Sequence, residues 1–295
     1  MLVFMTPIQA NSSCSDNDVI LQVLGSGGPE LGDQRASSSY LIWLNDKATI
    51  LVDTGAGSSL NFEKSGAKFE DLKAILFSHF HVDHSADFPA FIKGSFFTSR
   101  RQELPIYGPD GNHLMPSTSE FVQNLLGKKG AFRYLKDFIE PSSASDYHLK
   151  TIDVSLKPHK VEIFQLSEKI KLSAAPVHHG PIAAVAWRIN IAGCSITFSG
   201  DMSNKYQTLA VLAKNTDILV LHNAIPEALG GVAARLHMPP SVMGEIAKNA
   251  QAKRVIISHR MLRTLGKERE TKNYMAQSYS GSIIFANDLE RFVVK

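Results

Sequence analysis

Short runs of apolar residues, each bounded by turn residues, dominate the first part of the chain. They contain many β-branched side chains and end at Gly, Asp or Asn, a pattern typical of buried strands. Two stretches among them show helical spacing instead. The predicted strands are Val19–Leu24, Ser38–Leu44, Ala48–Val52 and Ala74–Ser78, and the predicted helices are Ser58–Lys64 and Ala86–Ile92.

The middle of the chain, residues 95–150, is less regular. Leu104–Tyr107 predicts a short strand that ends in the turn sequence Gly108–Gly111. A helix is expected near Ser117–Leu126, and Pro141–Ser145 has the composition of a surface loop.

Strands and helices alternate again in the second half. The strands predicted there are Thr151–Leu156, Glu162–Leu166, Lys171–Pro176, Ala183–Ile191, Ser195–Ser199, Ile218–His222 and Arg254–Ser258, and the helices are Tyr206–Lys214 and Ser241–Asn249. Two similar halves of strands flanked by helices predict an α/β fold, a four-layer αββα sandwich, in one domain over residues 18–295. The functional site is expected where strand ends from both halves meet.

Composition narrows the class of protein only slightly. The 295 residues are 44% hydrophobic and 20% charged, enough to bury one core. A net charge of +3 is too mild to indicate nucleic-acid binding, which needs clustered Lys and Arg. The densest basic stretches, Lys93–Arg101 and Lys128–Lys136, are short and predict a solvated surface. No apolar run reaches the roughly 18 residues that span a membrane, so no membrane partner is expected.

The N-terminus bears on localisation. Residues 1–17 are interpreted as a signal remnant or a disordered segment, because Met1–Ala10 is apolar but lacks a basic region before it. We expect a periplasmic or secreted protein, with the cytoplasm as the alternative. Of the two cysteines, Cys14 lies near the N-terminus and Cys194 lies in an apolar run. A disulfide is therefore not expected, and Cys194 is interpreted as a packed thiol.

The segment His79–His84, with the sequence HFHVDH, directly follows a predicted strand. Alternation along an extended backbone points His79 and His81 the same way. A tight turn then brings Asp83 and His84 beside them. Neutral imidazoles and a carboxylate are ligands that suit zinc or a similar cation, so this loop is a candidate metal site.

This segment resembles the His-x-His-x-Asp-His signature of the metallo-β-lactamase superfamily. Further elements of that family follow in the same order along most of the chain. They are Leu51–Gly55 with Asp53, Pro176–Gly180 with His179, Phe198–Asp201 with Asp201, and Ile257–His259 with His259.

The resemblance implies two zinc ions per chain, with Mn²⁺ or Fe²⁺ as alternatives. The first metal would be bound by His79, His81 and His179, the second by Asp83, His84 and His259, and Asp201 would bridge them. A hydroxide shared by the two metals would be the nucleophile. His178 is the alternative to its neighbour His179. Asp53 would orient a ligand imidazole, the alternative being a turn-forming Asp before Gly.

Two further histidines resemble segments of the tRNA 3′-processing branch. His237 matches the histidine of a His-Ser-Thr segment, although Met238 and Pro239 replace Ser and Thr. Together with Asp83 it is the expected catalytic residue, as a proton donor to the leaving group. His222 matches a His-Glu-Ala segment in which Asn223 replaces the glutamate. It is expected near the site as part of a proton relay or as a hydrogen-bonded structural histidine.

The resemblance favours a hydrolase that attacks a phosphodiester, a cyclic nucleotide or an aryl sulfate, with a small-molecule ester as substrate. A tRNA 3′-processing endonuclease is the first alternative. That branch commonly carries a tRNA-gripping arm between the third histidine and the bridging aspartate, whereas the interval from His179 to Asp201 holds only two strands and a turn. Nucleic acid is therefore disfavoured as a partner.

A lactonase or thioesterase is the second alternative, and a non-catalytic binding member of the fold is the third. A homodimer is expected. A set of aromatic residues is a candidate pocket wall for an apolar leaving group, with core packing as the competing interpretation. The set is Phe88, Phe91, Phe96, Phe97 and Tyr107.

Overall fold

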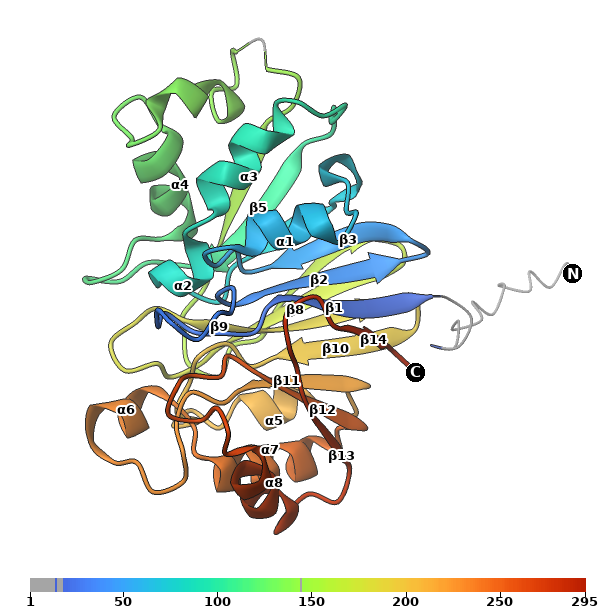
Figure 1. Ribbon diagram of the computed structural model, residues 1–295. Coiled ribbons are helices and arrows are strands. Elements are labelled where there is room, and N and C mark those ends of the chain that lie inside the picture. Colours follow the sequence, from blue (N-terminus) through green and yellow to red (C-terminus); the bar gives the residue numbers. More distant parts are fainter. Residues whose placement is uncertain (1–13, 15–17, 144) are drawn as a thin grey trace, which may run out of the picture.

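The computed structural model describes residue 14 and residues 18–143 and 145–295. Two seven-stranded sheets face each other (Figure 1). In spatial order the first sheet is β14 (Arg291–Val293), β1 (Val19–Gly25), β2 (Ser39–Leu44), β3 (Lys47–Val52), β4 (Ala74–Leu76), β5 (Leu104–Pro109) and β6 (Leu149–Val154). The second is β13 (Ser282–Phe285), β12 (Arg254–Ser258), β11 (Ile218–His222), β10 (Cys194–Phe198), β9 (Val185–Ile191), β8 (Ile170–Pro176) and β7 (Glu162–Ser167).

Most of the helices cover the outer faces of the two sheets (Figure 1). Those of the first half are α1 (Ser58–Lys64), α2 (Val82–Ser85), α3 (Phe88–Ser95) and α4 (Thr118–Leu126), with 3-10 turns η2 (Phe69–Asp71) and η3 (Arg133–Phe138). Those of the second half are α5 (Leu209–Leu212), α6 (Gly231–Leu236), α7 (Pro240–Ala250) and α8 (Glu268–Ala276). No helix in the described ranges is long and apolar enough to cross a membrane.

Three apolar layers hold the elements together. The middle layer lies between the sheets and includes Tyr40 and Trp187, both fully buried. One outer layer joins the first sheet to α1, α3 and α4, and the other joins the second sheet to α5, α7 and α8. The four-layer αββα sandwich is thereby confirmed. The single domain stays our proposal, supported by the middle layer that both halves share.

Parallel pairing aligns the strand ends that matter for function. In the first sheet β3, β4 and β5 run parallel, and in the second β10, β11 and β12 do. Because parallel strands place their carboxyl ends at one edge, the segments after them converge there. Asp53 follows β3, His79 follows β4, Asp201 follows β10 and His259 follows β12.

Helix predictions succeeded where local signals were strong. Helix α1 has the predicted bounds, and α4 begins one residue after its cap Ser117. Ser117 accepts a hydrogen bond from the Glu120 N–H, while the Glu120 carboxylate accepts one from the Ser117 N–H. The helix predicted at Tyr206–Lys214 is wrong in length, since only one turn, α5, forms.

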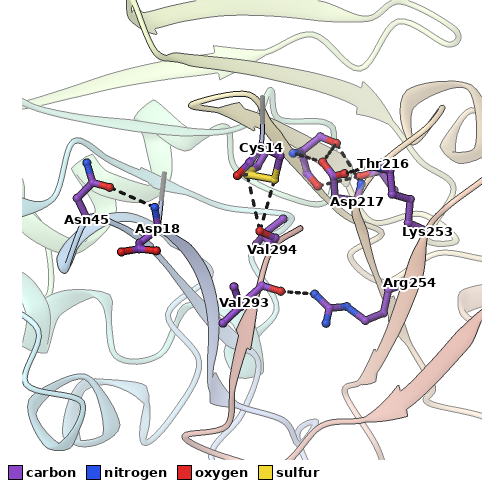
Figure 2. Close-up of a disulfide and its surroundings, with 11 residues drawn as sticks. Cys14, Asp18, Asn45, Thr216, Asp217, Lys253, Arg254, Val293 and Val294 are labelled. Atoms are coloured by element: carbon purple, nitrogen blue, oxygen red, sulfur yellow. Dashed lines mark hydrogen bonds and ion pairs between the residues drawn. A yellow bond between two sulfur atoms is a disulfide. The ribbon is translucent and has the colours of Figure 1, made fainter. Parts of the chain in front are cut away.

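Cys14 and Cys194 form a disulfide, so the expectation of no disulfide and of a packed thiol at Cys194 is wrong (Figure 2). The sandwich brings the start of β10 beside the segment before β1, although 180 residues separate the two cysteines in sequence. The Cys14 sulfur lies 3.4 Å from the carbonyl oxygen of Val294, just after β14. The signal segment predicted within residues 1–17 otherwise lies outside the described residues.

The aromatic pocket wall is also wrong. Phe88, Phe91 and Tyr107 are buried, and they pack in the apolar layers described above. Phe96 and Phe97 are exposed and lie against Lys93, whose ammonium is 4.5 Å and 5.0 Å from the two ring centroids. Core packing explains the first three, and the last two project from the end of α3.

Candidate metal centre

The carboxylate of Asp53 holds the His79–His84 loop in place. The Asp53 carboxylate accepts hydrogen bonds from the Ser78 N–H and hydroxyl at 2.7 and 2.8 Å, and from His84 Nδ1 at 2.8 Å. This leaves His84 Nε2 facing the centre, where it has no hydrogen-bond partner. The side chain of Asp53 thus acts on a histidine, as the resemblance implied, and does not merely form a turn.

Three histidines form the first group. His79 Nε2 lies 3.0 Å and His179 Nε2 lies 3.3 Å from His81 Nδ1. Burial lowers the pKa of His79 well below its usual value and also lowers the pKa of His81 and of His179. All three are therefore neutral imidazoles near pH 7, whose converging lone pairs are suited to a cation.

The second group adds Asp83, His84 and His259. Asp83 Oδ2 lies 3.1 Å from His259 Nε2 and 3.5 Å from His84 Nε2. Burial opposes ionisation of Asp83, yet His84 and His259 outweigh it and lower the pKa of Asp83 to about 2. Burial likewise opposes charge on His84, but Asp83 and Asp53 raise its pKa well above the usual value. A concentration of negative charge at this point favours a cation.

Asp201 lies between the two groups. Its Oδ2 is 3.9 Å from His179 Nε2 on one side, and 3.4 Å from His259 Nε2 and 3.8 Å from His84 Nε2 on the other. Its Oδ1 accepts a hydrogen bond from His222 Nδ1 at 2.8 Å. One carboxylate oxygen is therefore held away while the other faces both groups, as a bridging ligand requires.

His222 supports Asp201 rather than offering a free nitrogen. Its Nε2 is 2.9 Å from the hydroxyl of Tyr40, so both ring nitrogens are engaged. It lies close enough to His84, Asp201 and His259 to complete a ligand set, but a nitrogen already hydrogen-bonded does not bind a metal. Asn223 turns away, and its amide donates to the Ile225 carbonyl. Of the two interpretations of His222, the geometry favours the hydrogen-bonded histidine.

The structure distinguishes His179 from His178. The Nδ1 of His179 donates to the Leu236 carbonyl at 2.9 Å, which leaves Nε2 in the first group. His178 instead pairs with the Ser203 hydroxyl at 2.7 Å, and its ring contacts Tyr206. Only His179 reaches the centre.

His237 lies at the edge of the centre, in the step from α6 to α7. Its Nδ1 is 3.8 Å from Asp201 Oδ2 and has no hydrogen-bond partner. Burial lowers the pKa of His237 to about 4, so the imidazole is neutral near pH 7. A neutral imidazole still donates one N–H, although it lacks the extra proton of a general acid.

The residues present fit two cations. Unpartnered buried nitrogens on His84 and His237, three converging neutral imidazoles and two ionised carboxylates would otherwise be costly to bury. Backbone strain also marks this place as a functional site, because Asp53 and His259 both have positive φ angles, 56° and 50°.

The sequence did not indicate two supporting groups, the hydroxyl of Tyr40 and the carbonyl of Leu236. Tyr40 carries no local signal, since its position matches that of any other apolar strand residue.

Comparison with known proteins agrees with this geometry. Residues 32–241 match the model of the metallo-beta-lactamase superfamily. A ribonuclease Z of Mycobacterium sp. (strain KMS) is 26% identical over 291 residues, covering 92% of this chain and 95% of that protein. Among solved structures, the metallo-beta-lactamase fold protein YhfI from Bacillus subtilis superposes with a TM-score of 0.71 at 21% identity, covering 94% of this chain and 99% of that one.

The short form of human tRNase Z superposes with a TM-score of 0.70 at 18% identity, covering 94% of this chain and 99% of that one. At identities this low, the structural similarity establishes the fold alone. It is the fold predicted from the sequence. The match to the family model covers most of the chain and includes His79–His84, His179 and Asp201. The chain therefore belongs to the metallo-β-lactamase superfamily and is a metal-dependent hydrolase.

Proposed function

We propose that this chain hydrolyses phosphodiesters at a centre built for two divalent cations. The position of Asp201 carries the proposal, because its Oδ2 lies within 3.9 Å of imidazole nitrogens from both groups. One carboxylate oxygen between two sets of ligands suits a pair of neighbouring cations, the arrangement used by many phosphoesterases.

The first cation would be held by His79, His81 and His179, the second by Asp83, His84 and His259, and Asp201 would contact both. When bound, the pair would supply an ionised water at neutral pH and offset the negative charge that develops on the attacked phosphorus. We propose zinc, because this set of imidazoles and carboxylates suits it, while manganese and iron(II) accept the same ligands.

The residues of the chain supply orientation and a hydrogen bond. His222 and Tyr40 hold Asp201 with one oxygen toward the centre, and Asp53 holds His84. His237 is close enough to Asp201 to reach an oxygen of a bound ester, so we propose that its N–H is donated to the leaving-group oxygen. Asp83 contributes as an ionised ligand.

Precursor tRNA is the second candidate substrate. The named relatives are ribonuclease Z and tRNase Z, and their names favour nucleic acid over the small ester expected from the sequence. The structure offers one observation against tRNA. Strands β9 and β10, joined by Ala192 and Gly193, occupy residues 185–198 of the interval in which a tRNA-gripping arm would lie, and they leave only short connections on either side.

The disulfide supports a related proposal about localisation. Disulfides form and persist in oxidising compartments, and they are rare in the reducing cytosol. Cys14 and Cys194 are the two cysteines of the chain, and they are joined to each other. We therefore propose a periplasmic or secreted enzyme, which would be separated from precursor tRNA.

A substrate panel tests the function. Metal-replete protein is assayed with bis(p-nitrophenyl) phosphate, a cyclic nucleotide, p-nitrophenyl sulfate and a precursor tRNA under identical conditions. We expect turnover of the phosphodiester that disappears with a chelator and returns with zinc. Lack of phosphodiester turnover beside rapid cleavage of the sulfate would refute the proposal, and tRNA cleavage with the highest kcat/KM would place the second candidate first.

A further inference from the structure

Five of the exposed large apolar side chains lie on segments that reach the metal centre. They are Leu31, Val82, Leu114, Val232 and Leu262. Single exposed apolar residues are ordinary, whereas apolar surface gathered at one place can mark a binding site. The contacts of each segment show where these side chains stand relative to the candidate ligands.

Leu31 and Leu262 lie on the His259 side. Gly28 approaches His259 so closely that a Cβ on it would stand 3.0 Å from the imidazole Cε1. Two residues further on, the Glu30 carboxylate accepts a hydrogen bond from the Leu262 N–H at 2.5 Å. The segment that carries Leu31 is therefore fastened beside His259 and next to Leu262.

Val232 and Leu114 lie on the His179 side. Val232 belongs to α6, whose last residue, Leu236, accepts a hydrogen bond from His179. None of the residues of α6 is buried, so its apolar side chains have no core to cover. The loop before α4 is joined to the segment after His179, because the Asn112 amide donates to the Pro181 carbonyl at 3.0 Å.

Val82 completes the rim, since it follows His81 directly and is 68% exposed. Segments that carry exposed apolar side chains thus lie beside both metal groups, and they come from both halves of the sandwich. We call these five residues the apolar rim.

The same segments carry few free cations. Arg35 binds Ser26 and Asn287, Arg260 is buried against Glu268, and Arg263 donates to the Ala224 carbonyl. Among the arginines of these described segments, this leaves Arg235 without a hydrogen-bond or ion-pair partner, while Glu30 adds negative charge. A polyanion needs several unpaired Lys or Arg side chains along its path.

We infer that the apolar rim binds an aryl or alkyl group of a small anionic ester, so that the substrate is a phosphodiester with one apolar ester group. This inference rests on the proposed phosphodiesterase activity. The cations would select the anionic phosphate, and the rim would select the apolar group. A nucleic acid, polar and charged along its length, would gain little from Leu31, Leu114 or Val232.

A substrate series tests the inference. Methyl, butyl and phenyl p-nitrophenyl phosphates share one leaving group, so differences in kcat/KM report binding of the other group. One fully buried methylene is worth about 0.8 kcal/mol, or roughly fourfold. We expect the butyl and phenyl esters to exceed the methyl ester at least tenfold. Equal values for the three esters would overturn the inference, as would a higher kcat/KM for an oligonucleotide.

A variant with Leu31→Ser, Leu114→Ser and Val232→Ser should bring the butyl-to-methyl ratio close to one. The control is Val293→Ser, a similarly exposed valine on β14 near the disulfide, at the opposite strand ends (Figure 2). The control should keep the wild-type ratio. An unchanged ratio in the triple variant would refute the role of the rim.

Calorimetric binding of methyl and butyl esters of methylphosphonic acid separates this inference from the proposed function. Both ligands present the anionic group without a reactive leaving group. Tighter binding of the butyl ester, abolished in the triple variant, supports the rim even if no phosphodiester is hydrolysed. Equal binding of the two ligands beside normal hydrolysis would overturn the rim and leave the phosphodiesterase standing.

Discussion

The free nitrogen of each histidine decides what the centre can bind. Partners hold the Nδ1 atoms of His79, His84 and His179, so their Nε2 atoms face inward. His81 is the exception, because its Nδ1 faces the other two imidazoles of its group. It is also the one member of the group that is not fully buried, so the surrounding structure depends on it least.

This makes His81→Ala a selective test of the first group. We expect bound metal to fall after dialysis, and turnover to fall by more than the roughly 10- to 100-fold typical of losing a residue that only orients a ligand. Metal content by atomic emission and kcat/KM measure the two effects, and circular dichroism checks the fold. His148→Ala is the control, because this half-buried histidine lies just before β6, at the strand ends opposite the centre. Wild-type metal content in His81→Ala would show that the ligand assignment is wrong.

Tyr40→Phe tests the support of Asp201. Removing the hydroxyl leaves His222 Nε2 without its buried partner, and His222 then holds Asp201 Oδ1 less firmly. We expect weaker metal binding and a fall in kcat of about 10-fold or more with the fold retained. Tyr107→Phe is the control, because that buried ring contacts Phe164 and Trp187 instead. Metal affinity equal in the two variants would exclude the positioning role of Tyr40.

His237→Ala tests the hydrogen bond to the leaving group. A donor to the leaving oxygen matters most when that oxygen is a poor leaving group, because more charge then accumulates on it. We expect kcat to fall up to about 100-fold for alkyl leaving groups and far less for p-nitrophenolate. Rates measured over a series of leaving groups provide the answer. A uniform loss across the series would indicate that His237 only shapes the site.

The candidate ligands named from the sequence lie together in the structure, whereas some of the residues that support them were missed. His79, His81, Asp83 and His84 form one local motif, so their proximity follows from the chain itself. His222 was found through its resemblance, but its direction could be interpreted either way. Tyr40 was missed, because its contact with His222 joins residues 182 positions apart. Such contacts depend on how the two sheets face each other, which no local pattern specifies.

At the scale of elements, strong local signals gave reliable predictions and weak ones did not. Helix α4 has a capping box and an apolar stripe, and its position was predicted closely. Helix α8 is mostly polar, and strand β14 has only three residues, so neither was predicted. β14 is held in place by pairing with β1 near the other end of the chain, a long-range contact.

The short helix α6 contacts the segment of the metal centre at Gly180, the residue after His179. This glycine has a φ of 60°, and a Cβ on it would lie 2.6 Å from Leu236 Cδ2. Gly180→Ala should strain the backbone directly after His179 and force the Leu236 side chain to move, which disturbs the pairing of His179 Nδ1 with the Leu236 carbonyl. We expect roughly tenfold lower kcat/KM beside about 1–3 kcal/mol of lost stability from the backbone strain.

Gly66→Ala is the matched control for Gly180→Ala. Gly66 also has a positive φ, 77°, but a Cβ there would meet nothing within 4 Å. It should therefore show the backbone strain in urea unfolding without the loss of activity. If both variants lost the same activity, the change beside His179 and Leu236 would not be the cause.

At the scale of the whole molecule, the candidate metal ligands and the disulfide lie at opposite ends of the strands. The carboxyl ends of the parallel strands carry the candidate ligands, while the disulfide sits at the start of β10, at the other end of the strand that leads to Asp201 (Figure 2). The disulfide ties the chain before β1 to the second sheet, and Val294 lies against it. It therefore strengthens the contact between the halves without touching the centre.

Replacing both cysteines by serine tests this separation. A link between residues 180 positions apart restricts the unfolded chain strongly, so we expect the free energy of unfolding to fall by about 2–5 kcal/mol. At 25 °C, kcat/KM and metal content should stay at wild-type values, because the metal centre lies at the opposite strand ends.

Urea unfolding with and without a reductant measures the contribution of the disulfide. The reductant should lower the stability of the wild-type protein to that of the variant and should leave the variant unchanged. Equal stability of the oxidised protein and the variant would show that the bond contributes nothing to folding, and a loss of metal in the variant would show that the two ends of the sandwich are coupled.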